Sequence, residues 1–374
     1  MKFSDFNLDQ KLMECIQDLT FETPTPIQEE AIPLIHANND VVGLAQTGTG
    51  KTAAYALPIL QALLNTPPGP IQTLVLVPTR ELADQVCDEF MALGRKTSLR
   101  CTTLYGGVNI NPQISRLQMG VDIVIACPGR LLDHMERGTI DLTSVSKLVL
   151  DEADRLFDMG FIPDVRKIIS QLPKQRQTLL FSATMSDDIR QLVNDILHRP
   201  RTVEIAANAP TPTVTHVLFP VKENRKAELL IEILYLEQKY TRSVLIFTRT
   251  KHRAREVTKW LQSYGHKVAL LEGDLTQFRR SNAIQGFRDG TFQILVATDI
   301  AARGIDVAGI SHVINYDMPD NAEAYIHRIG RTGRIQESGV AYTFATPRDK
   351  TAVQALDRML KGKMERRILE QFGA

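Results

Sequence analysis

Short apolar runs rich in valine, isoleucine and leucine recur along the chain, separated by amphipathic stretches. Runs of this kind are typical of strands that are buried on both faces of a parallel sheet. In the first half of the chain they lie at residues 40–45, 73–78, 122–127, 147–154 and 177–184. In the second half they lie at residues 243–250, 267–273, 293–299, 311–317 and 340–346.

Helical patterns fill the intervals between these runs. Residues 81–94 and 187–197 in the first half, and 252–265 and 322–330 in the second, space their apolar positions along one helix face. The alternation of strand and helix predicts an α/β fold in which each half is a doubly wound, mostly parallel sheet flanked by helices. The last segment, residues 361–374, is expected to form a final helix.

Length favours two domains, because 374 residues exceed what one ordinary core organises. A proline-containing segment separates the two runs of strands and helices. The predicted domains are therefore residues 1–206 and 214–374, joined by a linker at residues 207–213.

Composition is that of a globular chain without a membrane span. Hydrophobic residues make up 43% and charged residues 23%, and no apolar run approaches the roughly 18 residues that a spanning helix needs. The N-terminus lacks the pattern of a secretory signal, so a cytoplasmic location is expected. The four cysteines include no CxxC pair and are expected to be reduced thiols.

Charge differs between the halves. Residues 1–206 hold 19 lysines and arginines against 25 acids, a net charge of −6, whereas residues 207–374 hold 25 against 18, a net charge of +7. A basic domain suits contacts with nucleic-acid phosphates, although a well-solvated surface without a partner would have the same composition. Motifs must decide between these alternatives.

The segment AQTGTGKT, residues 45–52, follows a predicted strand and opens a helix, which is the context of a phosphate-binding loop. Its glycines let backbone N–H groups converge on phosphate oxygens, and the helix N-terminus adds its positive end. Lys51 is expected to reach the β- and γ-phosphates and Thr52 to bind Mg²⁺. Ala45 departs from the usual first glycine. Kinases, GTPases and transporter ATPases share such loops.

Two acids at the end of a later strand narrow the choice. Asp151 is placed to bind Mg²⁺ through water, and Glu152 to orient and deprotonate the water that attacks the γ-phosphate. The expected metal ligands are therefore Thr52 and Asp151.

Four motifs together resemble the DEAD-box RNA helicase family. They are AQTGTGKT at residues 45–52, DEAD at 151–154, SAT at 182–184 and HRIGRTGR at 327–334, in the family's order and over nearly the whole chain. The overall likeness is to the bacterial RhlE-like branch. The resemblance implies two tandem RecA-like domains that bind ATP, Mg²⁺ and RNA.

The resemblance implies an adenine-sensing motif at FETPTPIQ, residues 21–28. Gln28 is expected to pair with the adenine edge, Phe3 to stack on the base, and Asp306 to bind the ribose. The residues expected to hold ATP are Phe3, Phe21, Gln28, Gln46, Thr47, Gly48, Thr49, Gly50, Lys51, Thr52 and Asp306.

RNA-facing elements are implied in both halves, among them PTREL at residues 78–82 and CPGR at 127–130. Taken without the family, PTREL would equally suit a strand-to-helix turn. CPGR usually begins with threonine, so Cys127 lacks a hydroxyl for the RNA backbone. The residues expected to contact phosphates and sugars, with little sequence preference, are Arg80, Gly107, Arg130, Arg249, Arg280, Thr298 and Gly304.

SAT is implied to couple ATP to strand separation, because Ser182 and Thr184 would contact Asp154, the last acid of DEAD. A competing explanation is that these hydroxyls cap the helix that follows. His327 is expected to link the two domains.

HRIGRTGR is implied to complete the ATPase site. Arg331 and Arg334 are expected to act as arginine fingers on the γ-phosphate, worth roughly 10³–10⁵ in turnover. The expected catalytic residues are Lys51, Asp151, Glu152, Arg331 and Arg334.

The implied function is RNA-stimulated ATP hydrolysis coupled to domain closure, gripping of an RNA strand and local duplex unwinding. The alternative is an ATP-gated RNA clamp that serves as a platform and unwinds little. A DNA-translocating motor is disfavoured because the motifs resemble the RNA branch. RNA-processing or ribosome-assembly proteins are candidate partners, and the sequence indicates neither the RNA target nor the oligomeric state.

Overall fold

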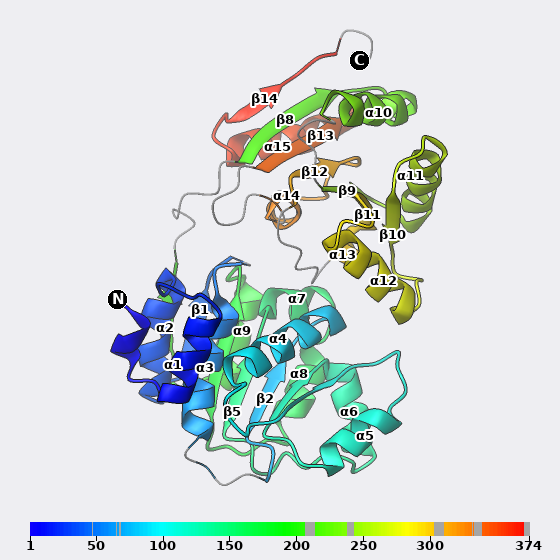
Figure 1. The fold of residues 1–374 in the computed structure, drawn as a ribbon. Coiled ribbons are helices and arrows are strands. Elements are labelled where there is room, and N and C mark those ends of the chain that lie inside the picture. Colours follow the sequence, from blue (N-terminus) through cyan, green and yellow to red (C-terminus); the bar gives the residue numbers. More distant parts are fainter. Residues whose placement is uncertain are drawn as a thin grey trace. The chain divides into compact units, whose positions relative to one another are not determined.

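The computed structural model describes residues 1–46, 48–64, 66, 69–205, 214–237, 243–302, 310–330, 332 and 339–369. The chain divides into two compact units, Met1–Ala209 and Pro210–Ala374 (Figure 1). The linker at residues 207–213 lies outside the described residues, so the predicted domain bounds stay a prediction. The described residues include no helix long and apolar enough to cross a membrane.

A seven-stranded sheet forms the centre of the first unit. Its strands are β1 (Val41–Leu44), β2 (Thr73–Leu76), β3 (Cys101–Leu104), β4 (Ile123–Ala126), β5 (Lys147–Leu150), β6 (Gln177–Ser182) and β7 (Arg201–Glu204). They pair in parallel in the order β3-β4-β2-β5-β6-β1-β7.

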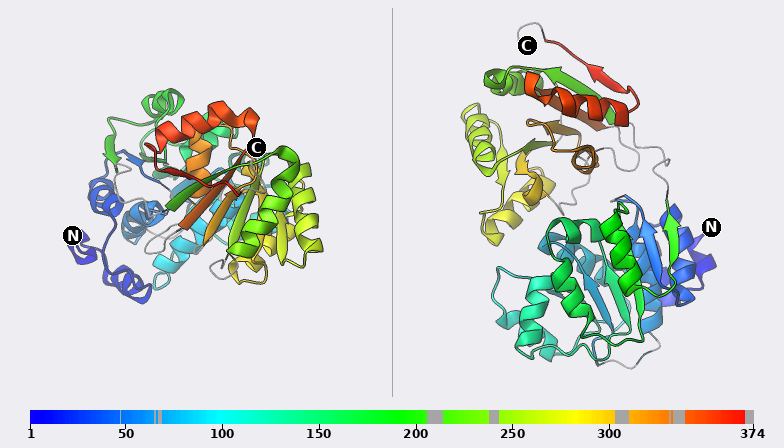
Figure 2. Two further views of the ribbon diagram at one scale, coloured as in Figure 1. Left: turned by 90° about the horizontal axis from the view of Figure 1, so that it is seen from above. Right: turned by 180° about the vertical axis from the view of Figure 1, so that it is seen from behind.

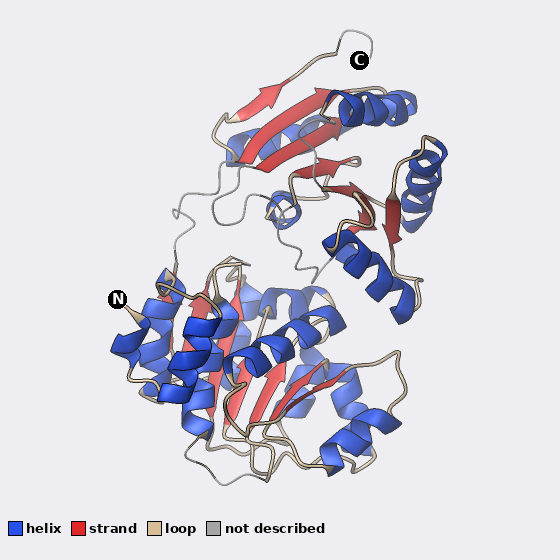
Figure 3. Ribbon diagram, in the orientation of Figure 1, coloured by secondary structure: helices blue, strands red, loops and turns tan. Residues whose placement is uncertain are grey.

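Helices cover both faces of this sheet (Figure 2, Figure 3). They are η1 (Phe3–Phe6), α1 (Gln10–Asp18), α2 (Pro26–His36), α3 (Lys51–Leu63), α4 (Arg80–Leu93), α5 (Asn111–Gln118), α6 (Pro128–Glu136), α7 (Ala153–Asp158), α8 (Ile162–Ile169) and α9 (Asp187–Ile196). One apolar cluster joins α2, α3 and α4 to the sheet, and a second joins α6, α8 and α9 to it.

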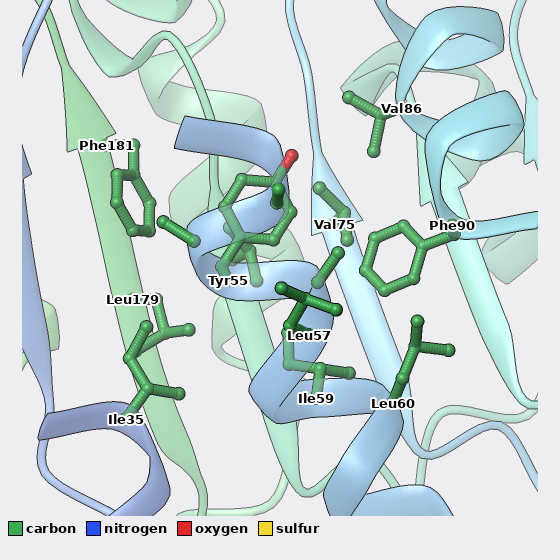
Figure 4. Close-up of a cluster of buried hydrophobic side chains, with 14 of the residues drawn as sticks. Ile35, Tyr55, Leu57, Ile59, Leu60, Val75, Val86, Phe90, Leu179 and Phe181 are labelled. Carbon is green, nitrogen blue, oxygen red and sulfur yellow. The ribbon is translucent and has the colours of Figure 1, made fainter. Parts of the chain in front are cut away.

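Helix α3 lies at the centre of the first apolar cluster, and its residues from Ala53 to Leu60 are buried. Figure 4 shows Tyr55 and its neighbours packed between strand β6, with Phe181, and helix α4, with Phe90. Burial on all sides explains why the helix is apolar around its circumference rather than on one face. The packing holds the start of α3 in a fixed place beside the strand ends.

The second unit repeats this architecture with another seven-stranded parallel sheet. Its strands are β8 (Val214–Pro220), β9 (Val244–Thr248), β10 (Val268–Leu271), β11 (Ile294–Thr298), β12 (His312–Asn315), β13 (Gly339–Ala345) and β14 (Met364–Arg366). The order is β10-β11-β9-β12-β13-β8-β14. The predicted doubly wound α/β architecture is therefore confirmed in both units.

Helices again flank this second sheet. They are η2 (Glu223–Arg225), α10 (Lys226–Leu236), α11 (Lys251–Ser263), α12 (Gln277–Arg288), α13 (Asp299–Ala302), α14 (Ala322–Ile329), η3 (Pro347–Asp349) and α15 (Lys350–Met359).

The expectation of a helix over residues 361–374 is wrong for the part that the structure describes. Lys361 and Gly362 both have positive φ, at 52° and 74°, and turn the chain out of α15. Residues 364–366 then form strand β14, which pairs with β8 at the edge of the sheet. The left-handed pair ends the helical path, and an open sheet edge offers the backbone hydrogen bonds that a helix would have supplied.

Candidate active site

The predicted site residues of the first unit gather at one edge of its sheet, where the parallel strands end. The phosphate loop follows β1, DEAD follows β5, and SAT begins at the end of β6; these three strands are neighbours. The predicted RNA-facing segments follow β2, β3 and β4, which are also neighbours. The strand order thus places the predicted nucleotide-binding segments and the predicted RNA-facing segments on two neighbouring parts of one sheet edge.

The phosphate loop has the backbone form that a phosphate site needs. Gly48 and Gly50 have φ of 81° and 85°, a region that side chains rarely adopt. The Lys51 ammonium is buried and donates to the carbonyl of Ala45 at 2.9 Å, which holds it across the loop. The Thr49 hydroxyl donates to the Gln46 carbonyl at 2.8 Å.

Gln28 lies directly against this loop. Its side-chain oxygen accepts from the Thr25 N–H at 2.9 Å, and its amide nitrogen donates to the Gly50 carbonyl at 3.1 Å. A side chain at position 50 would overlap the Gln28 amide. Gly50 is therefore required both for its conformation and for this close approach.

Of the two predicted aromatic residues, Phe21 presents more of its ring to solvent. The rings of Phe3 and Phe21 stack with centroids 6.3 Å apart. Phe3 is 4% exposed and Phe21 is 37% exposed. Phe3 therefore supports Phe21 from below, and the solvent-facing ring of the pair belongs to Phe21.

Asp151 is a buried acid with two hydrogen-bond donors. Its Oδ2 accepts from the Tyr55 hydroxyl at 2.8 Å and its Oδ1 from the Glu152 N–H at 2.9 Å. Burial raises the pKa of Asp151, and the positive charge of Lys51 opposes that rise. Tyr55 hydrogen-bonds both Asp151 and Thr52. Oxygen atoms of this kind are the ligands that Mg²⁺ prefers, so the two residues fit the predicted metal.

Glu152 has a strained backbone and an ion-paired side chain. Its backbone is left-handed, with φ of 52° and ψ of 53°, which is uncommon for a residue with a side chain. Its carboxylate pairs with the Arg155 guanidinium one helical turn later, and both side chains are almost fully buried. Strain of this kind concentrates at functional sites, because the surrounding structure must over-determine it.

Asp154 connects DEAD to SAT. Its Oδ2 accepts from the N–H groups of Ala183 and Thr184, at 3.1 and 3.2 Å, and lies 3.4 Å from the Thr184 hydroxyl. The competing explanation, that a SAT hydroxyl caps the next helix, is wrong. Ser186 caps α9 instead, accepting from the Ile189 N–H at 3.3 Å.

Two arginines lie among the predicted RNA-facing segments. Gly107 has φ of 75°, and a side chain there would overlap the Arg80 guanidinium. Arg130 donates to the carbonyl of Val108 at 2.9 Å. The segments after β2, β3 and β4 are thereby joined, which sequence spacing alone did not reveal. Cys127 lies at the start of α6 without a capping bond from its side chain.

In the second unit, Arg249 and Thr298 also lie where strands end, and Arg280 lies in a helix. Arg249 follows β9 and donates to the Met318 carbonyl at 3.1 Å. Thr298 is the last residue of β11, and Arg280 in the first turn of α12 donates to the Ala301 carbonyl at 3.3 Å. Because β11 and β9 are neighbours and Thr298 pairs with Thr248, Arg249 and Thr298 lie close together at the same sheet edge.

Several predicted residues lie outside the described part of the chain: Thr47, Gly304, Asp306, Arg331, Arg334 and the side chain of His327. Their expected roles stay predictions.

Comparison with protein families decides the identity. Residues 25–192 match the DEAD/DEAH box helicase model, and residues 225–336 match the helicase conserved C-terminal domain. The chain belongs to the DEAD/DEAH box helicase family. Its expected function and enzyme class, a DEAD-box ATP-dependent RNA helicase, are confirmed.

Individual relatives agree with this assignment. The chain is 42% identical to the DEAD-box ATP-dependent RNA helicase CshA of Geobacillus kaustophilus, over 97% of its own length and 78% of the relative's. It is also 42% identical to CshA of Bacillus subtilis, over 97% and 73%. S. cerevisiae Dbp5 bound to RNA and ADP BeF3 shares 31% identity and a TM-score of 0.88, over 99% and 96%. These relatives do not confirm the RhlE-like branch.

Three arrangements in this DEAD-box helicase were not predicted. Tyr55 contacts Asp151, Arg155 pairs with Glu152, and Arg328 forms a bidentate ion pair with Asp299 at 2.6 and 2.7 Å. Two of these residues lie within or beside motifs recognised in the sequence. Arg155 follows DEAD and is three residues from Glu152, a spacing that favours an ion pair on a helix. Arg328 is an additional arginine within HRIGR. Tyr55 gave none, because a tyrosine inside an apolar helix resembles ordinary core.

Proposed function

We propose that this helicase binds ATP and Mg²⁺ at the β1–β6–β5 part of its first sheet and couples hydrolysis to gripping and local opening of RNA. The proposal rests on the three hydrogen bonds that Asp154 accepts from Ala183 and Thr184. It joins the segment that holds Asp151 and Glu152 to the strand end next to the phosphate loop. A movement of DEAD on nucleotide binding or hydrolysis would therefore shift SAT directly through Asp154.

For the nucleotide, the residues already converge. Lys51 would exchange its bond to the Ala45 carbonyl for bonds to the β- and γ-phosphates, and the N–H groups from Gly48 to Thr52 would donate to the same phosphate oxygens. Gln28 uses one amide hydrogen and one oxygen lone pair in hydrogen bonds to Gly50 and Thr25. Its remaining donor and acceptor would pair with the adenine edge, with Phe21 beside the base.

For the chemistry, Asp151 and Thr52 would hold the magnesium ion, which when bound neutralises phosphate charge and orients the γ-phosphate. Glu152 would accept the proton of the attacking water. Arg155 fixes one oxygen of the Glu152 carboxylate and leaves it anchored within the strained turn. Arg331 and Arg334 of the second unit are proposed to stabilise charge on the γ-phosphate, and Asp306 to bind the ribose.

For RNA, Arg80, Gly107 and Arg130 would contact the strand on the first unit, and Arg249, Arg280 and Thr298 on the second, together with Gly304. Backbone N–H groups and arginines bind phosphates and sugars of any sequence. Each set of contacts is small and would bind RNA weakly alone. Both sets would engage the strand only in the closed state of the two domains, which ATP also favours, so each ligand would raise the affinity for the other. The similar Dbp5, solved with RNA and ADP BeF3, supports this proposal.

Steady-state ATP hydrolysis with and without single-stranded RNA tests the function, with DNA of the same sequence as control. RNA should stimulate turnover and DNA should not. Lys51→Ala and Glu152→Gln should remove the stimulated rate, and Arg331→Ala should reduce it by a factor in the range of roughly 10³–10⁵. Equal stimulation by DNA, or normal turnover in Glu152→Gln, would refute these assignments.

The narrower placements are also proposals. Membership of the RhlE-like branch, a cytoplasmic location and RNA-processing or ribosome-assembly partners extend the family assignment. Co-sedimentation of the protein with ribosome precursors in cell extract, with the Lys51→Ala variant in parallel, tests the partner proposal.

A further inference from the structure

Tyr55 places a hydroxyl deep inside the first unit, immediately behind the metal-binding carboxylate. The residue lies on α3, one helical turn after Lys51, and is fully buried. Its ring packs against Phe181 and Phe90, with centroids 5.2 and 6.1 Å away. Figure 4 shows the hydroxyl oxygen projecting beyond this aromatic cluster. The packing fixes the ring, and so fixes where the hydroxyl points.

That hydroxyl donates to the Oδ2 atom of Asp151, at 2.8 Å, and Thr52 is a second hydrogen-bond partner of Tyr55. The other carboxylate oxygen accepts from the N–H of Glu152, the next residue in the chain. Within the part of the chain that the structure describes, no further side chain donates a hydrogen bond to Asp151. Tyr55 is thus the side chain that sets the rotation of the carboxylate about its Cβ–Cγ bond.

We infer that Tyr55 is a positioning residue for the magnesium ion: its hydroxyl fixes which lone pairs of Asp151 face the cation and its water. The inference rests on the proposed role of Asp151 as a metal ligand. A phenylalanine at position 55 would keep every ring contact and leave the carboxylate held by the Glu152 N–H alone. Mutation of a residue that holds a metal ligand in place typically lowers metal affinity by about 10–100-fold.

A purely structural role for Tyr55 makes a different prediction. A buried tyrosine with a satisfied hydroxyl stabilises the fold whether or not a cation is bound. Loss of the hydroxyl would then lower stability and leave the difference between metal-bound and metal-free nucleotide affinity unchanged. The two roles separate when nucleotide binding is measured both with and without Mg²⁺.

The experiment titrates full-length protein with a fluorescent ADP analogue in excess Mg²⁺ and again in EDTA, for the wild type and Tyr55→Phe. The ratio of the two dissociation constants measures how much the cation contributes. We expect Tyr55→Phe to weaken binding in Mg²⁺ about threefold to tenfold, at or below the usual range for such residues because the cation is held through water, and to leave binding in EDTA unchanged. Replacement of Mg²⁺ by Mn²⁺ allows the same comparison by electron paramagnetic resonance.

Tyr342→Phe is the matched control. Tyr342 is also a buried tyrosine that donates to a carboxylate, Oε1 of Glu237 at 2.7 Å, but it lies on β13 of the second unit. Its Mg²⁺ ratio should equal that of the wild type. Asp151→Asn should abolish the Mg²⁺ benefit altogether.

Each outcome has a distinct meaning. If Asp151→Asn abolishes the benefit and Tyr55→Phe leaves it intact, the inference fails and the proposed site stands. If Asp151→Asn leaves the benefit intact, the proposed metal ligand itself is wrong. If Tyr55→Phe loses its cooperative thermal transition without nucleotide, the hydroxyl serves the fold and the inference is overturned.

Discussion

Gly107 meets two separate demands on a single residue. Its φ of 75° disfavours any side chain, and a Cβ atom would overlap the Arg80 guanidinium. Gly107→Ala should therefore strain the loop by about 1–2 kcal/mol and displace the arginine. We expect roughly tenfold weaker affinity for labelled single-stranded RNA, the change that about 1.4 kcal/mol produces, measured by fluorescence anisotropy with a non-hydrolysable ATP analogue present.

Gly106→Ala supplies the control for this prediction. Gly106 precedes the same turn, but its φ is outside the left-handed region and a Cβ atom there would meet open space. RNA affinity should stay within about twofold of the wild type, since the substitution introduces neither strain nor overlap. Equal losses in both variants would mean that the loop tolerates no side chain at all, and that the approach of Arg80 is not the cause.

At the scale of elements, the short segment between β6 and α9 holds two hydroxyl residues, one proposed to couple ATP hydrolysis to duplex opening and one that stabilises a helix. Thr184 contacts Asp154, whereas Ser186 caps α9. Thr184→Val keeps the shape of the side chain and removes its hydroxyl. We expect it to retain RNA-stimulated ATP hydrolysis while duplex release per ATP falls severalfold, measured by strand displacement and phosphate release on the same sample.

Ser186→Ala should have the opposite effects. Loss of the cap should lower the free energy of unfolding by about 1 kcal/mol, because an N-terminal N–H loses its partner. Duplex release per ATP should remain that of the wild type. A variant of Ser186 that uncouples hydrolysis from release would show that the position of α9, rather than the Thr184 hydroxyl, carries the connection.

The sequence predicted those elements whose cause is local. Strands such as β2 and β4 are continuous apolar runs, and parallel strands that are buried on both faces must be so. Strand β7 was missed because three of its four residues are exposed at a sheet edge. Strand β14 was mistaken for a helix, since its only buried residue is Met364 and pairing with β8 determines its state.

The site follows the same rule. The phosphate loop and DEAD were predictable because their function requires particular residues at fixed spacing. Contacts between distant segments were not, as with Arg130 and the Val108 carbonyl or Tyr55 and Asp151. The strand order brings these pairs together, and no pattern in the sequence states the strand order. Ser186 replaced Thr184 as the helix cap because caps depend on where the helix begins, which sequence patterns locate only to within a few residues.

At the scale of the whole molecule, the proposed RNA contacts should appear in the salt dependence of binding. The arginines proposed to meet phosphates are Arg80, Arg130, Arg249 and Arg280. Each neutralised phosphate of a single strand contributes about −0.7 to the slope of log affinity against log salt concentration, so the slope should be about −3. Two of these arginines lie in residues 1–206, whose net charge is −6, and two lie in residues 207–374, whose net charge is +7.

Arg249→Gln tests one of these contacts. The slope should become shallower by about 0.7 because one phosphate loses its partner, while nucleotide affinity stays unchanged. Arg201→Gln, at an exposed arginine on edge strand β7 outside the proposed contacts, should keep the wild-type slope. Filter binding from low to physiological salt, with the ATP analogue saturating, measures both. If both substitutions shift the slope equally, general charge rather than a defined path for the strand attracts the RNA; if neither does, Arg249 meets no phosphate.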